Sequence, residues 1–505
     1  MEAQGHQVDI KLGLSPDELI KEVPGAQALV IRSATQVTAE VLAAGSDLVV
    51  VGRAGIGLDN VDVEEATRRA VMVVNAPQSN ILSAAEHTMA LLLAQARNIP
   101  QAHASLIAGK WERSKWEGIE LHGKTLGVVG LGKVGTLVAQ RALAFGMKLA
   151  AYDPYVSEDR ARQLGVELMS IGDLVSSSDF MTVHLPKTPE TVGLINADLL
   201  AKARPGLRII NTARGGIIDE DALAEAIASR KIAGAALDVF SKEPCTASRL
   251  FGLEGVVVTP HLGASTVEAQ DKAGATIAEQ VLLALAGDFV PFAVNVAAAD
   301  VSETVRPFLP LAERLGKIFA SLNDGLPGKL QASYQGAIGG YDTGILTLAV
   351  LKGLFSATSD EPVSFVNASQ LAKERGLEIH ETRTVTVRDY VNLIELKSGS
   401  HSIAGTLSGS KNEPRVVMVD GYVVECPPSD YLLVVRNEDR PGMIGVVGTM
   451  LGEAGVSISS MAVGPPVEGS HALMVLAIDQ PTPKGVIDQL SSHPGIDEVH
   501  SVSAI

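Results

Sequence analysis

Residues 126–135 read Leu126-Gly127-Val128-Val129-Gly130-Leu131-Gly132-Lys133-Val134-Gly135, an apolar run that breaks into glycines and then continues with helical spacing. The pattern predicts a strand, a tight turn and a helix. In this G-x-G-x-x-G spacing the first glycine permits the turn, the second lets the backbone approach a pyrophosphate, and the third lets the helix pack closely on the strand. The free amides at the helix N-terminus then face the phosphates. The stretch therefore predicts a dinucleotide site.

The next strand supports this interpretation, because a G-x-G-x-x-G alone can arise by chance in a chain with 49 glycines. After an amphipathic helix, a second apolar run over residues 147–152 ends at Asp153, about 20 residues beyond the glycines. A carboxylate at that place accepts hydrogen bonds from an adenine ribose. Asp153 is followed by Pro154 and Tyr155, and not by an arginine that could bind a 2′-phosphate. The sequence therefore favours NAD over NADP.

Length and charge limit the classes of function. The chain has 505 residues, which predicts three or four domains. Its net charge of −17 argues against nucleic acid or an anionic membrane as a partner, because both need clustered Lys and Arg. Cys245 and Cys426 form neither a disulfide framework nor a metal-ligand spacing, so no metal site is predicted. The first residues lack the features of a signal peptide, and we expect a cytoplasmic protein, or an organelle stroma if a targeting segment preceded Met1.

Alternating strand-like and helical segments predict an α/β protein followed by α+β parts. We expect residues 1–78 to begin a small α/β domain, 79–264 to form a doubly wound domain with six or seven parallel strands, and 265–300 to return to the first domain. Residues 301–428 mix helices and alternating strands without a catalytic constellation. Residues 429–505 show the βαββαβ order of a ferredoxin-like fold.

Two predicted strands of the first domain end in arginine. Arg32 comes after the run Ala28–Ile31, and Arg53 comes after the run Leu48–Val51. Because ligands bind beyond the carboxyl ends of parallel strands, both are candidates for binding an anion. The alternative is that each is an ordinary surface arginine.

The helix predicted over residues 79–96 contains Glu86 and His87, which look like a catalytic pair. Neighbours in sequence point about 100° apart on a helix, so structural roles are predicted for both. Further on, the segment Trp111–Trp116 holds both tryptophans of the chain together with basic side chains. That composition is typical of an interface anchor.

Three polar residues fall at the carboxyl edge of the dinucleotide domain: Arg214, Glu243 and His261. Hydride removal from a secondary alcohol needs a base for the hydroxyl proton, a group that orients this base, and a cation for the neighbouring carboxylate. A histidine, a glutamate and an arginine can fill these roles. Taken singly, each can also be a capped histidine, a solvated glutamate or a surface arginine.

The motifs around these residues carry a family resemblance. Ala-Arg-Gly-Gly (213–216), Leu-Asp-Val-Phe-Ser-Lys-Glu-Pro (237–244) and Pro-His-Leu-Gly-Ala-Ser-Thr (260–266), in this order after the glycine fingerprint, resemble the D-2-hydroxyacid dehydrogenases. Phe-Val-Asn at 365–367 and the C-terminal unit narrow the resemblance to the long-form D-3-phosphoglycerate dehydrogenase family, over nearly the whole chain. It implies a flavodoxin-like substrate domain (1–78 and 265–300), a Rossmann-type NAD domain (79–264), an intervening regulatory domain that can bind anions (301–428) and an ACT domain (429–505).

Carried over position by position, the resemblance implies His261 as general acid/base, Glu243 as the partner that raises its pKa, and Arg214 as the residue that binds the substrate carboxylate. Further substrate contacts are implied for Arg32, Arg53 and Asn80, and for Arg113 from a neighbouring subunit. The positions that match cofactor contacts are Gly130, Gly132, Lys133, Val134, Gly135, Asp153, His184, Ala213, Asp238, Gly263 and Ala264.

The resemblance also implies a homo-oligomer, dimer or tetramer, and L-serine as a possible effector of the ACT domain. Asn437 and Asp439 in a predicted loop, and Ser457, occupy the serine-contact positions. Serine-binding members often have asparagine where this chain has Ser457, so serine feedback is predicted to be weak or absent. Members also usually begin earlier, with a strand and a helix ahead of Val8–Leu12, so an N-terminal strand is expected to be missing.

The function that these residues and the resemblance imply is NAD-dependent oxidation of 3-phospho-D-glycerate to 3-phosphooxypyruvate, the first step of phosphorylated L-serine biosynthesis. One alternative is another D-2-hydroxyacid dehydrogenase, such as a hydroxypyruvate or glyoxylate reductase. The other is a non-catalytic NAD-sensing regulatory protein on the same scaffold.

Overall fold

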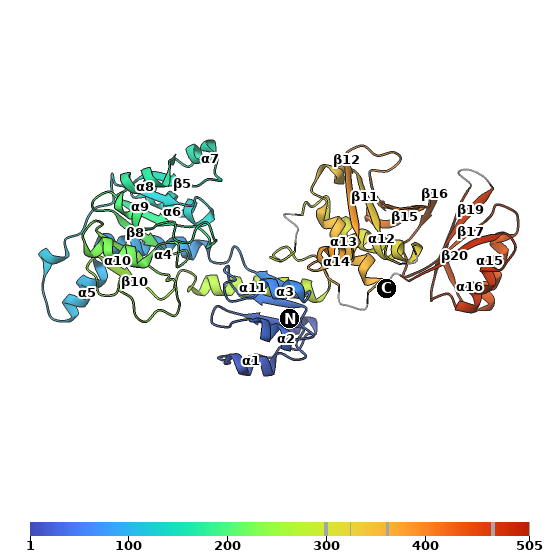
Figure 1. Cartoon of the computed structure of the whole chain (residues 1–505), viewed down its shortest axis with the longest axis horizontal. Coiled ribbons are helices and arrows are strands. Elements are labelled where there is room, and N and C mark those ends of the chain that lie inside the picture. The colour runs from blue at the N-terminus through green and yellow to red at the C-terminus, as the bar shows by residue number, and fades with distance from the viewer. Residues whose placement is uncertain (297–300, 324, 360–362, 466–469, 504–505) are drawn as a thin grey trace. The chain divides into compact units, whose positions relative to one another are not determined.

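The computed structural model describes residues 1–296, 301–323, 325–359, 363–465 and 470–503 (Figure 1). The chain divides into two compact units, the first formed by 1–53, 58–75 and 278–505 and the second by 54–57 and 76–277. The predicted domain boundary at 300/301 adjoins residues 297–300, which lie outside the described part. The five-part division stays a prediction.

The second unit is built on a seven-stranded parallel sheet in the order β10-β9-β8-β7-β4-β5-β6. Its strands are β4 (Thr125–Val129), β5 (Lys148–Tyr152), β6 (Glu167–Leu168), β7 (Phe180–Val183), β8 (Arg208–Asn211), β9 (Gly234–Leu237) and β10 (Val256–Val258). The chain reverses its direction of winding between β4 and β7. In open parallel sheets, ligands bind beyond the carboxyl ends of the strands at such a switch point.

Helices cover both faces of this sheet, because successive strand residues point to opposite sides. Ile209 enters the core beneath α8, α9 and α10, whereas Ile210 enters the core beneath α4 and α6. Asp219 caps α10 by accepting hydrogen bonds from the amides of Asp221 and Ala222. The helices are α4 (Ile81–Ala96), α5 (Ile99–Ile107), α6 (Lys133–Ala144), α7 (Glu158–Gln163), α8 (Ile171–Ser177), α9 (Ala197–Ala201) and α10 (Glu220–Ala228), with the 3₁₀ turn η2 (Arg113–Trp116).

The first unit begins with a three-stranded parallel sheet in the order β1-β2-β3. Asn295, after the chain returns, fastens to β3 by accepting from the Val73 amide at 2.9 Å and donating to the Val71 carbonyl at 2.9 Å. Residues 8–12 lie outside this sheet. Its elements are η1 (Glu2–Gln4), α1 (Pro16–Glu22), β1 (Ala28–Ile31), α2 (Ala39–Ala44), β2 (Val50–Arg53), α3 (Val63–Arg68) and β3 (Met72–Asn75), and α11 (Val267–Leu285) runs from the second unit into the first.

The middle of the first unit is a six-stranded sheet in the order β12-β11-β13-β14-β15-β16, with one parallel pair, β11 and β12. Gly316 and Gly353 let α12 and α13 approach closely, since a Cβ at either residue would lie about 2 Å from a carbonyl oxygen of the other helix. The elements are η3 (Arg306–Phe308), α12 (Leu309–Leu322), β11 (Lys329–Gly336), η4 (Ala337–Gly340), α13 (Gly344–Ser356), α14 (Ala368–Glu374), β12 (Glu378–Thr384), β13 (Asn392–Ser398), β14 (His401–Ser408), β15 (Glu413–Val419) and β16 (Tyr422–Cys426).

The C-terminal part is a four-stranded antiparallel sheet in the order β18-β19-β17-β20, with two helices. This order confirms the predicted ferredoxin-like fold. Its elements are β17 (Tyr431–Glu438), α15 (Met443–Glu453), β18 (Ile458–Gly464), β19 (His471–Ile478), α16 (Lys484–Ser491) and β20 (Ile496–Ser503). Within the described ranges, no helix has the length and apolarity that a bilayer crossing requires.

Some local expectations are wrong. The sequence predicts a strand over Thr384–Val387, but β12 ends at Thr384, and most of its residues are exposed, so they lack an apolar alternation. The run predicted over Leu48–Val51 is displaced by two residues, since β2 spans Val50–Arg53, but Arg53 ends this strand as expected. The segment 97–123, for which no helix is predicted, contains α5, whose nine residues are never fully buried.

Candidate active site

The centre of the candidate site is the pair formed by His261, which follows β10, and Glu243, in the loop after β9. Their atoms Nδ1 and Oε2 lie 2.6 Å apart. The hydrogen bond to Glu243 raises the pKa of His261 and outweighs the lowering by burial and by the charge of Arg214. Burial raises the pKa of Glu243, but the hydrogen bonds from His261 and the Phe240 amide outweigh it, so this pKa lies below its ordinary value. The pair is therefore a histidine poised to hold a proton beside a carboxylate that stays ionised.

The backbone of His261 is held in an uncommon conformation. Its φ of 56° lies in the left-handed region, which residues other than glycine rarely adopt. Its amide donates to the carbonyl oxygens of Asp238, at 2.8 Å, and Thr259, at 3.1 Å. Backbone strain of this kind persists only where neighbouring contacts enforce it, and it gathers at functional sites.

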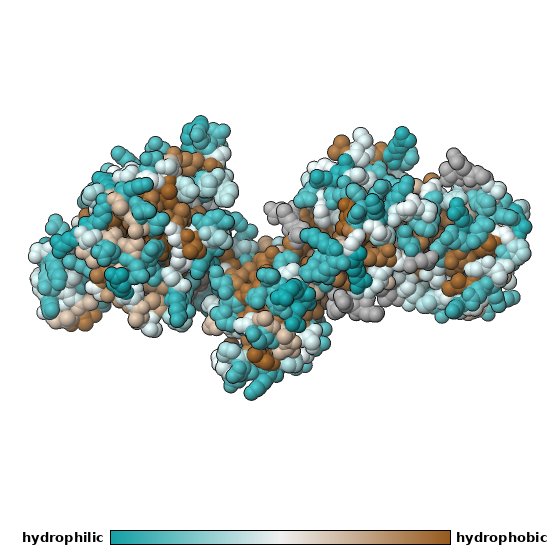
Figure 2. All heavy atoms as spheres, in the orientation of Figure 1, coloured by the Kyte–Doolittle hydropathy of each residue, from teal (hydrophilic) through white to brown (hydrophobic). Residues whose placement is uncertain are grey.

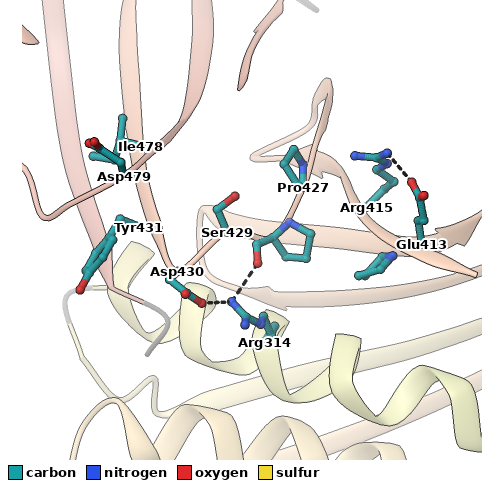
Figure 3. Close-up of a pocket in the computed structure, with 11 residues that line it drawn as sticks. Arg314, Glu413, Arg415, Pro427, Ser429, Asp430, Tyr431, Ile478 and Asp479 are labelled. Atoms are coloured by element: carbon teal, nitrogen blue, oxygen red, sulfur yellow. Dashed lines mark hydrogen bonds and ion pairs between the residues drawn. The ribbon is translucent and has the colours of Figure 1, made fainter. Parts of the chain in front are cut away.

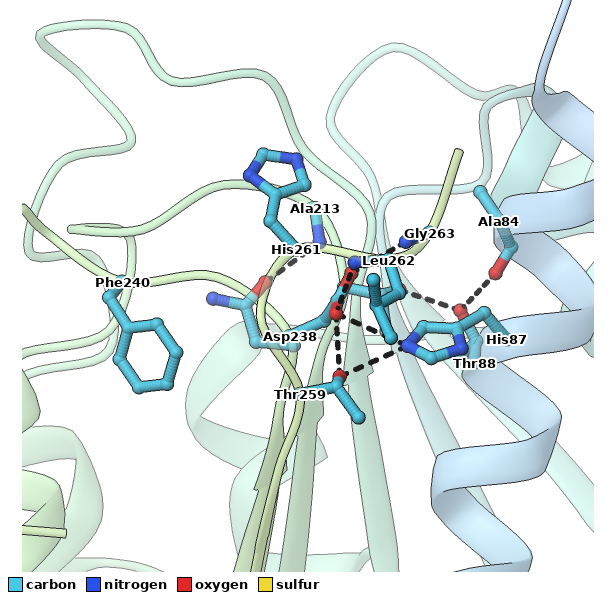
Figure 4. A network of polar contacts seen from close by, with 12 residues as sticks. Ala84, His87, Thr88, Ala213, Asp238, Phe240, Thr259, His261, Leu262 and Gly263 are labelled. Atoms are coloured by element: carbon cyan, nitrogen blue, oxygen red, sulfur yellow. Dashed lines mark hydrogen bonds and ion pairs between the residues drawn. The ribbon is translucent and has the colours of Figure 1, made fainter. Parts of the chain in front are cut away.

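The loop of His261 is also held by the fully buried side chain of Asp238, the residue that follows β9 (Figure 4). Its Oδ1 accepts from the Thr259 hydroxyl at 2.6 Å and the Leu262 amide at 2.7 Å, and its Oδ2 accepts from the Gly263 amide at 2.8 Å. His87 of α4 places Nε2 3.2 Å from the same Oδ1. Burial raises the pKa of Asp238, but these hydrogen bonds outweigh it, so the pKa falls below its ordinary value and the group is a carboxylate.

Arg214 reaches the same edge from the loop after β8. Asn211 shapes this loop, since its side chain donates to the Arg214 carbonyl at 2.9 Å and accepts from the Ala213 amide at 3.0 Å. The neighbouring Gly215 packs against the loop that carries Glu243, because a Cβ there would lie 1.9 Å from the Phe240 carbonyl oxygen. The structure thus brings Arg214, Glu243 and His261 to one edge of the sheet.

The glycine fingerprint forms the predicted strand, turn and helix. Gly130 has a φ of 97°, and a Cβ at Gly135 would lie 2.0 Å from the Gly130 carbonyl oxygen, so both positions require glycine. Gly132 caps α6, and a Cβ there would meet nothing within 4 Å. This open space beside the helix N-terminus fits a pyrophosphate. Asp153 fixes the turn, since its Oδ2 accepts from the Leu131 amide at 2.8 Å.

The other predicted cofactor positions lie around this turn or on the His261 loop. Lys133 and Val134 open α6. His184 follows β7 on the other side of the switch point, and burial lowers its pKa to about 4, so the ring is neutral near pH 7. Ala213 precedes Arg214, and Gly263 and Ala264 follow His261. The Asp238 carboxylate is occupied by the protein groups described above, and its contact with a cofactor stays a prediction.

The predicted substrate contacts are divided between the units. In the first, Arg32 directly follows β1 and Arg53 ends β2, where residues 31 and 53 are paired neighbours in the parallel sheet. In the second, Asn80 is the N-cap residue of α4, and Arg113 is exposed at the start of η2.

The predicted regulatory residues are not brought together within one chain. Asn437 is not in a loop as expected but in β17, where it is 3% exposed and paired with Ala472 of β19. Ser457 directly precedes β18. The first residue of β18 pairs with Ile478 of β19, and Ile478 also pairs with Tyr431 at the start of β17. Tyr431 and Asn437 are six positions apart along β17, which is about 20 Å of strand. Asp439 lies near Asn437, in the loop that follows β17, and the predicted serine contacts of these three residues stay a prediction.

A separate cavity of about 590 Å³ lies where α12, β15 and β17 meet, within the first unit (Figure 3). Both arginines that line it are paired with carboxylates. Arg314 contacts Asp430 at 2.5 Å, and Arg415 contacts Glu413 at 2.8 Å. This charge balance gives the cavity no excess of positive charge for an anion.

Comparison with known proteins identifies the chain. Family models match three segments: the NAD-binding domain of D-isomer specific 2-hydroxyacid dehydrogenases over 89–263, the D-3-phosphoglycerate dehydrogenase intervening domain over 304–420, and the ACT domain over 431–495. D-3-phosphoglycerate dehydrogenase of Mycobacterium leprae is 50% identical over 491 residues, covering 96% of this chain and 93% of that protein. The chain belongs to the D-3-phosphoglycerate dehydrogenase family.

Other members and more distant structures agree with this. The D-3-phosphoglycerate dehydrogenase of a Synechocystis strain is 46% identical over 503 residues, with 98% of this chain and 91% of that protein covered. The NAD-dependent formate dehydrogenase of Staphylococcus aureus, solved in complex with NAD, is 33% identical with a TM-score of 0.52 over 56% of this chain and 86% of that one. The similarity to D-3-phosphoglycerate dehydrogenases therefore covers nearly the whole chain, whereas the similarity to the formate dehydrogenase covers 56% of it.

Proposed function

We propose that this chain oxidises 3-phospho-D-glycerate at C2 to 3-phosphooxypyruvate with NAD, the first step of phosphorylated L-serine biosynthesis. The observation that carries the proposal is the His261–Glu243 pair beside Arg214, at the sheet edge that also holds the glycine turn. Membership in the family over nearly the whole length supports the substrate.

His261 is the base in this reaction. Its Nδ1 is bonded to Glu243, which leaves Nε2 to take the C2 hydroxyl proton. The Glu243 carboxylate stabilises the imidazolium that forms, and Arg214 holds the substrate carboxylate beside it. NAD, when bound, supplies the acceptor for the hydride of C2. Gly130, Gly132 and the start of α6 hold its pyrophosphate, and Asp153 holds its adenine ribose.

Arg32 and Arg53 are the residues proposed to recognise the phosphate of the substrate. They stand at the carboxyl ends of adjacent parallel strands, where two guanidinium groups can share one dianion. Asn80 is proposed as a further contact to the substrate.

A homo-oligomer is proposed to complete the site with Arg113 from a neighbouring subunit. The segment formed by α5, η2 and the residues between them exposes apolar side chains that a monomer would leave in water (Figure 2). Ile107 is 74% exposed and Trp111 is 77% exposed, with Ile99 and Leu106 each more than half exposed. Such a patch on a projecting segment is typical of a subunit interface.

Steady-state rates of the full-length protein test the function. We expect NADH formation with 3-phospho-D-glycerate and much slower reaction with D-glycerate, hydroxypyruvate or glyoxylate. A preference for the unphosphorylated acids would favour another D-2-hydroxyacid dehydrogenase, and NAD binding without turnover of any of them would indicate a sensor.

In Arg53→Ala, the KM for the phosphorylated substrate should rise more than that for D-glycerate, and equal changes would remove the proposed role of Arg53.

A further inference from the structure

We propose that α4 positions the two catalytic loops through consecutive residues: His87 holds the loop of His261, and Thr88 holds the loop of Arg214. The proposal rests on the proposed function for the roles of those loops. Neither residue is expected to touch substrate or cofactor. Both act through the ends of strands β8, β9 and β10.

The donors and acceptors around His87 show that its Nε2 carries a hydrogen. Thr259 donates its only hydroxyl hydrogen to Asp238 at 2.6 Å, because the carboxylate has none to give. His87 Nε2 lies 3.1 Å from that hydroxyl oxygen and 3.2 Å from Oδ1 of Asp238, two acceptors. Nε2 must therefore carry a hydrogen, and His87 is a donor to both groups (Figure 4).

This donor helps to keep Asp238 charged in a fully buried place, and Asp238 in turn holds three consecutive residues of the loop. Its carbonyl accepts from the amide of His261, and its carboxylate accepts from the amides of Leu262 and Gly263. A buried carboxylate that loses a partner is costly, so the loop is expected to shift or to admit water when His87 cannot donate. The left-handed backbone at His261 makes this loop sensitive, because the strain is released once the contacts are lost.

Thr88 makes the matching connection on the other side. Its hydroxyl donates to the Ala84 carbonyl at 2.7 Å, within α4. The Thr212 hydroxyl lies 2.6 Å from it and must be the donor of that contact, since the single hydrogen of Thr88 is already used. Thr212 stands two residues before Arg214, so the bond fixes the start of the Arg214 loop.

The positions of His87 and Thr88 on α4 distinguish the proposed positioning of the two loops from ordinary packing of this helix on the sheet. Glu86, next to His87, is exposed to solvent, while His87 is partly buried and Thr88 is fully buried. Gln95, two turns further along the same helix, also binds the sheet, donating to the Gly255 carbonyl at 3.3 Å before β10 begins. Gln95 lies at the opposite ends of the strands from His261, so it provides a matched control.

The test compares His87→Phe, His87→Gln and Gln95→Leu in the full chain. Phenylalanine keeps the ring but removes the donor, whereas the glutamine amide restores a donor near the place of Nε2. We expect kcat to fall roughly 10²-fold in His87→Phe, the loss typical of a misplaced catalytic group, with the KM for NAD little changed. His87→Gln should recover most of the rate. Gln95→Leu should lower the melting temperature and leave kcat unchanged.

Thr88→Val should mainly affect KM, whereas His87→Phe should mainly affect kcat. Losing one hydrogen bond behind the Arg214 loop should raise the KM for phosphoglycerate by about tenfold, with a smaller effect on kcat.

A second readout needs neither substrate nor cofactor: NMR titration of the His261 ring, which faces the charges of Glu243, Asp238 and Arg214. Its pKa should fall in His87→Phe, because the loop no longer holds the ring against Glu243, and should stay unchanged in Gln95→Leu.

Two results would overturn the proposal. One is a folded His87→Phe protein with the wild-type kcat and the wild-type His261 titration. The other is an equal loss of kcat in His87→Phe and Gln95→Leu, which would show only a weakened helix. If the wild-type protein did not oxidise phosphoglycerate, the proposed function would fail, and the titration would still decide whether His87 positions His261.

Discussion

The His261–Glu243 pair is the residue-scale feature on which the chemistry depends, and its pKa relationship gives a testable sign. For oxidation, His261 must be neutral to accept the proton, so the rate falls as pH drops below its pKa. Glu243 raises that pKa. In Glu243→Gln the anion is lost and the pKa of His261 falls, which moves the acidic limb of the rate profile to lower pH.

The plateau of the same profile should also drop in Glu243→Gln, by roughly 10- to 10²-fold, as part of the 10²–10⁴ that general acid–base catalysis contributes. The measurement is kcat/KM against pH for both proteins at saturating NAD. An acidic limb at the same pH in wild type and variant would rule out Glu243 as the group that sets the His261 pKa.

Individual residues show where sequence reasoning ends. Arg214, Glu243 and His261 can be selected because each lies at a predicted strand end beside a distinctive motif, and the structure places them at one sheet edge. The network behind them cannot be read in this way. Asp238 depends on His87, more than 150 residues earlier in the chain, and the spacing of neighbours on a helix argues only that His87 is not paired with Glu86.

At the scale of elements, two glycines near the turn between β4 and α6 have different roles: Gly132 leaves space for the ligand, and Gly135 lets the helix pack on the strand. Gly132 has a φ of −65° and open space where a Cβ would stand, whereas a Cβ at Gly135 would meet the Gly130 carbonyl at 2.0 Å. We expect Gly132→Val to fold with a melting temperature close to wild type while its affinity for NAD falls at least tenfold, because the side chain fills the space of the pyrophosphate.

Gly135→Ala is the matched control for that substitution, and it should lower the melting temperature itself through the clash with Gly130. Calorimetric titration with NAD and thermal unfolding would be measured for both variants. Unaltered NAD affinity in Gly132→Val would mean that the dinucleotide does not approach this turn.

The segment of α5 and η2 yields a prediction about assembly. Replacing Trp111 by Asp puts a charge in the exposed apolar patch, and we expect sedimentation velocity at micromolar concentration to show a smaller species than the wild-type oligomer. His6→Gln, at a partly exposed residue of the first unit, serves as a control and should sediment as wild type. A wild-type protein that sediments as a monomer would contradict the proposed oligomer.

The elements also explain which parts of the fold escape prediction. Six strands of the seven-stranded sheet are buried apolar runs, and each of these is found within a few residues of its observed bounds. The seventh, β6, is not predicted, because it has only two residues and neither is fully buried. Helix α5 is missed because it buries none of its residues, so it has no core-facing stripe, and Pro100 in its first turn reads as a break. β12 is displaced for the same reason, since an exposed edge strand lacks the apolar alternation by which strands are recognised.

For the whole molecule, the C-terminal sheet bears on regulation. Asn437 and Ser457 stand near opposite ends of the sheet, so a serine site that uses both needs two chains. Ser457 is shorter than the asparagine of serine-binding members and offers one donor in place of two. A lost hydrogen bond of about 0.5–1.5 kcal/mol corresponds to a roughly two- to tenfold weaker affinity.

Calorimetry of the assembled protein with L-serine measures this directly, and we expect weak or undetectable binding. Ser457→Asn should strengthen the binding, since it restores the second donor. Tight binding of serine by the unaltered protein would show that other groups replace the missing amide.

The central claim for the molecule is that His261 and NAD together remove a proton and a hydride from one alcohol carbon of a phosphorylated acid. 3-Phospho-D-glycerate carrying deuterium at C2 tests it most directly, with mass spectrometry of the nucleotide and the acid after a single turnover with NAD. We expect the deuterium to appear in the reduced nucleotide and the acid to become 3-phosphooxypyruvate. Deuterium released to water, or left at C2 with NAD still oxidised, would contradict it.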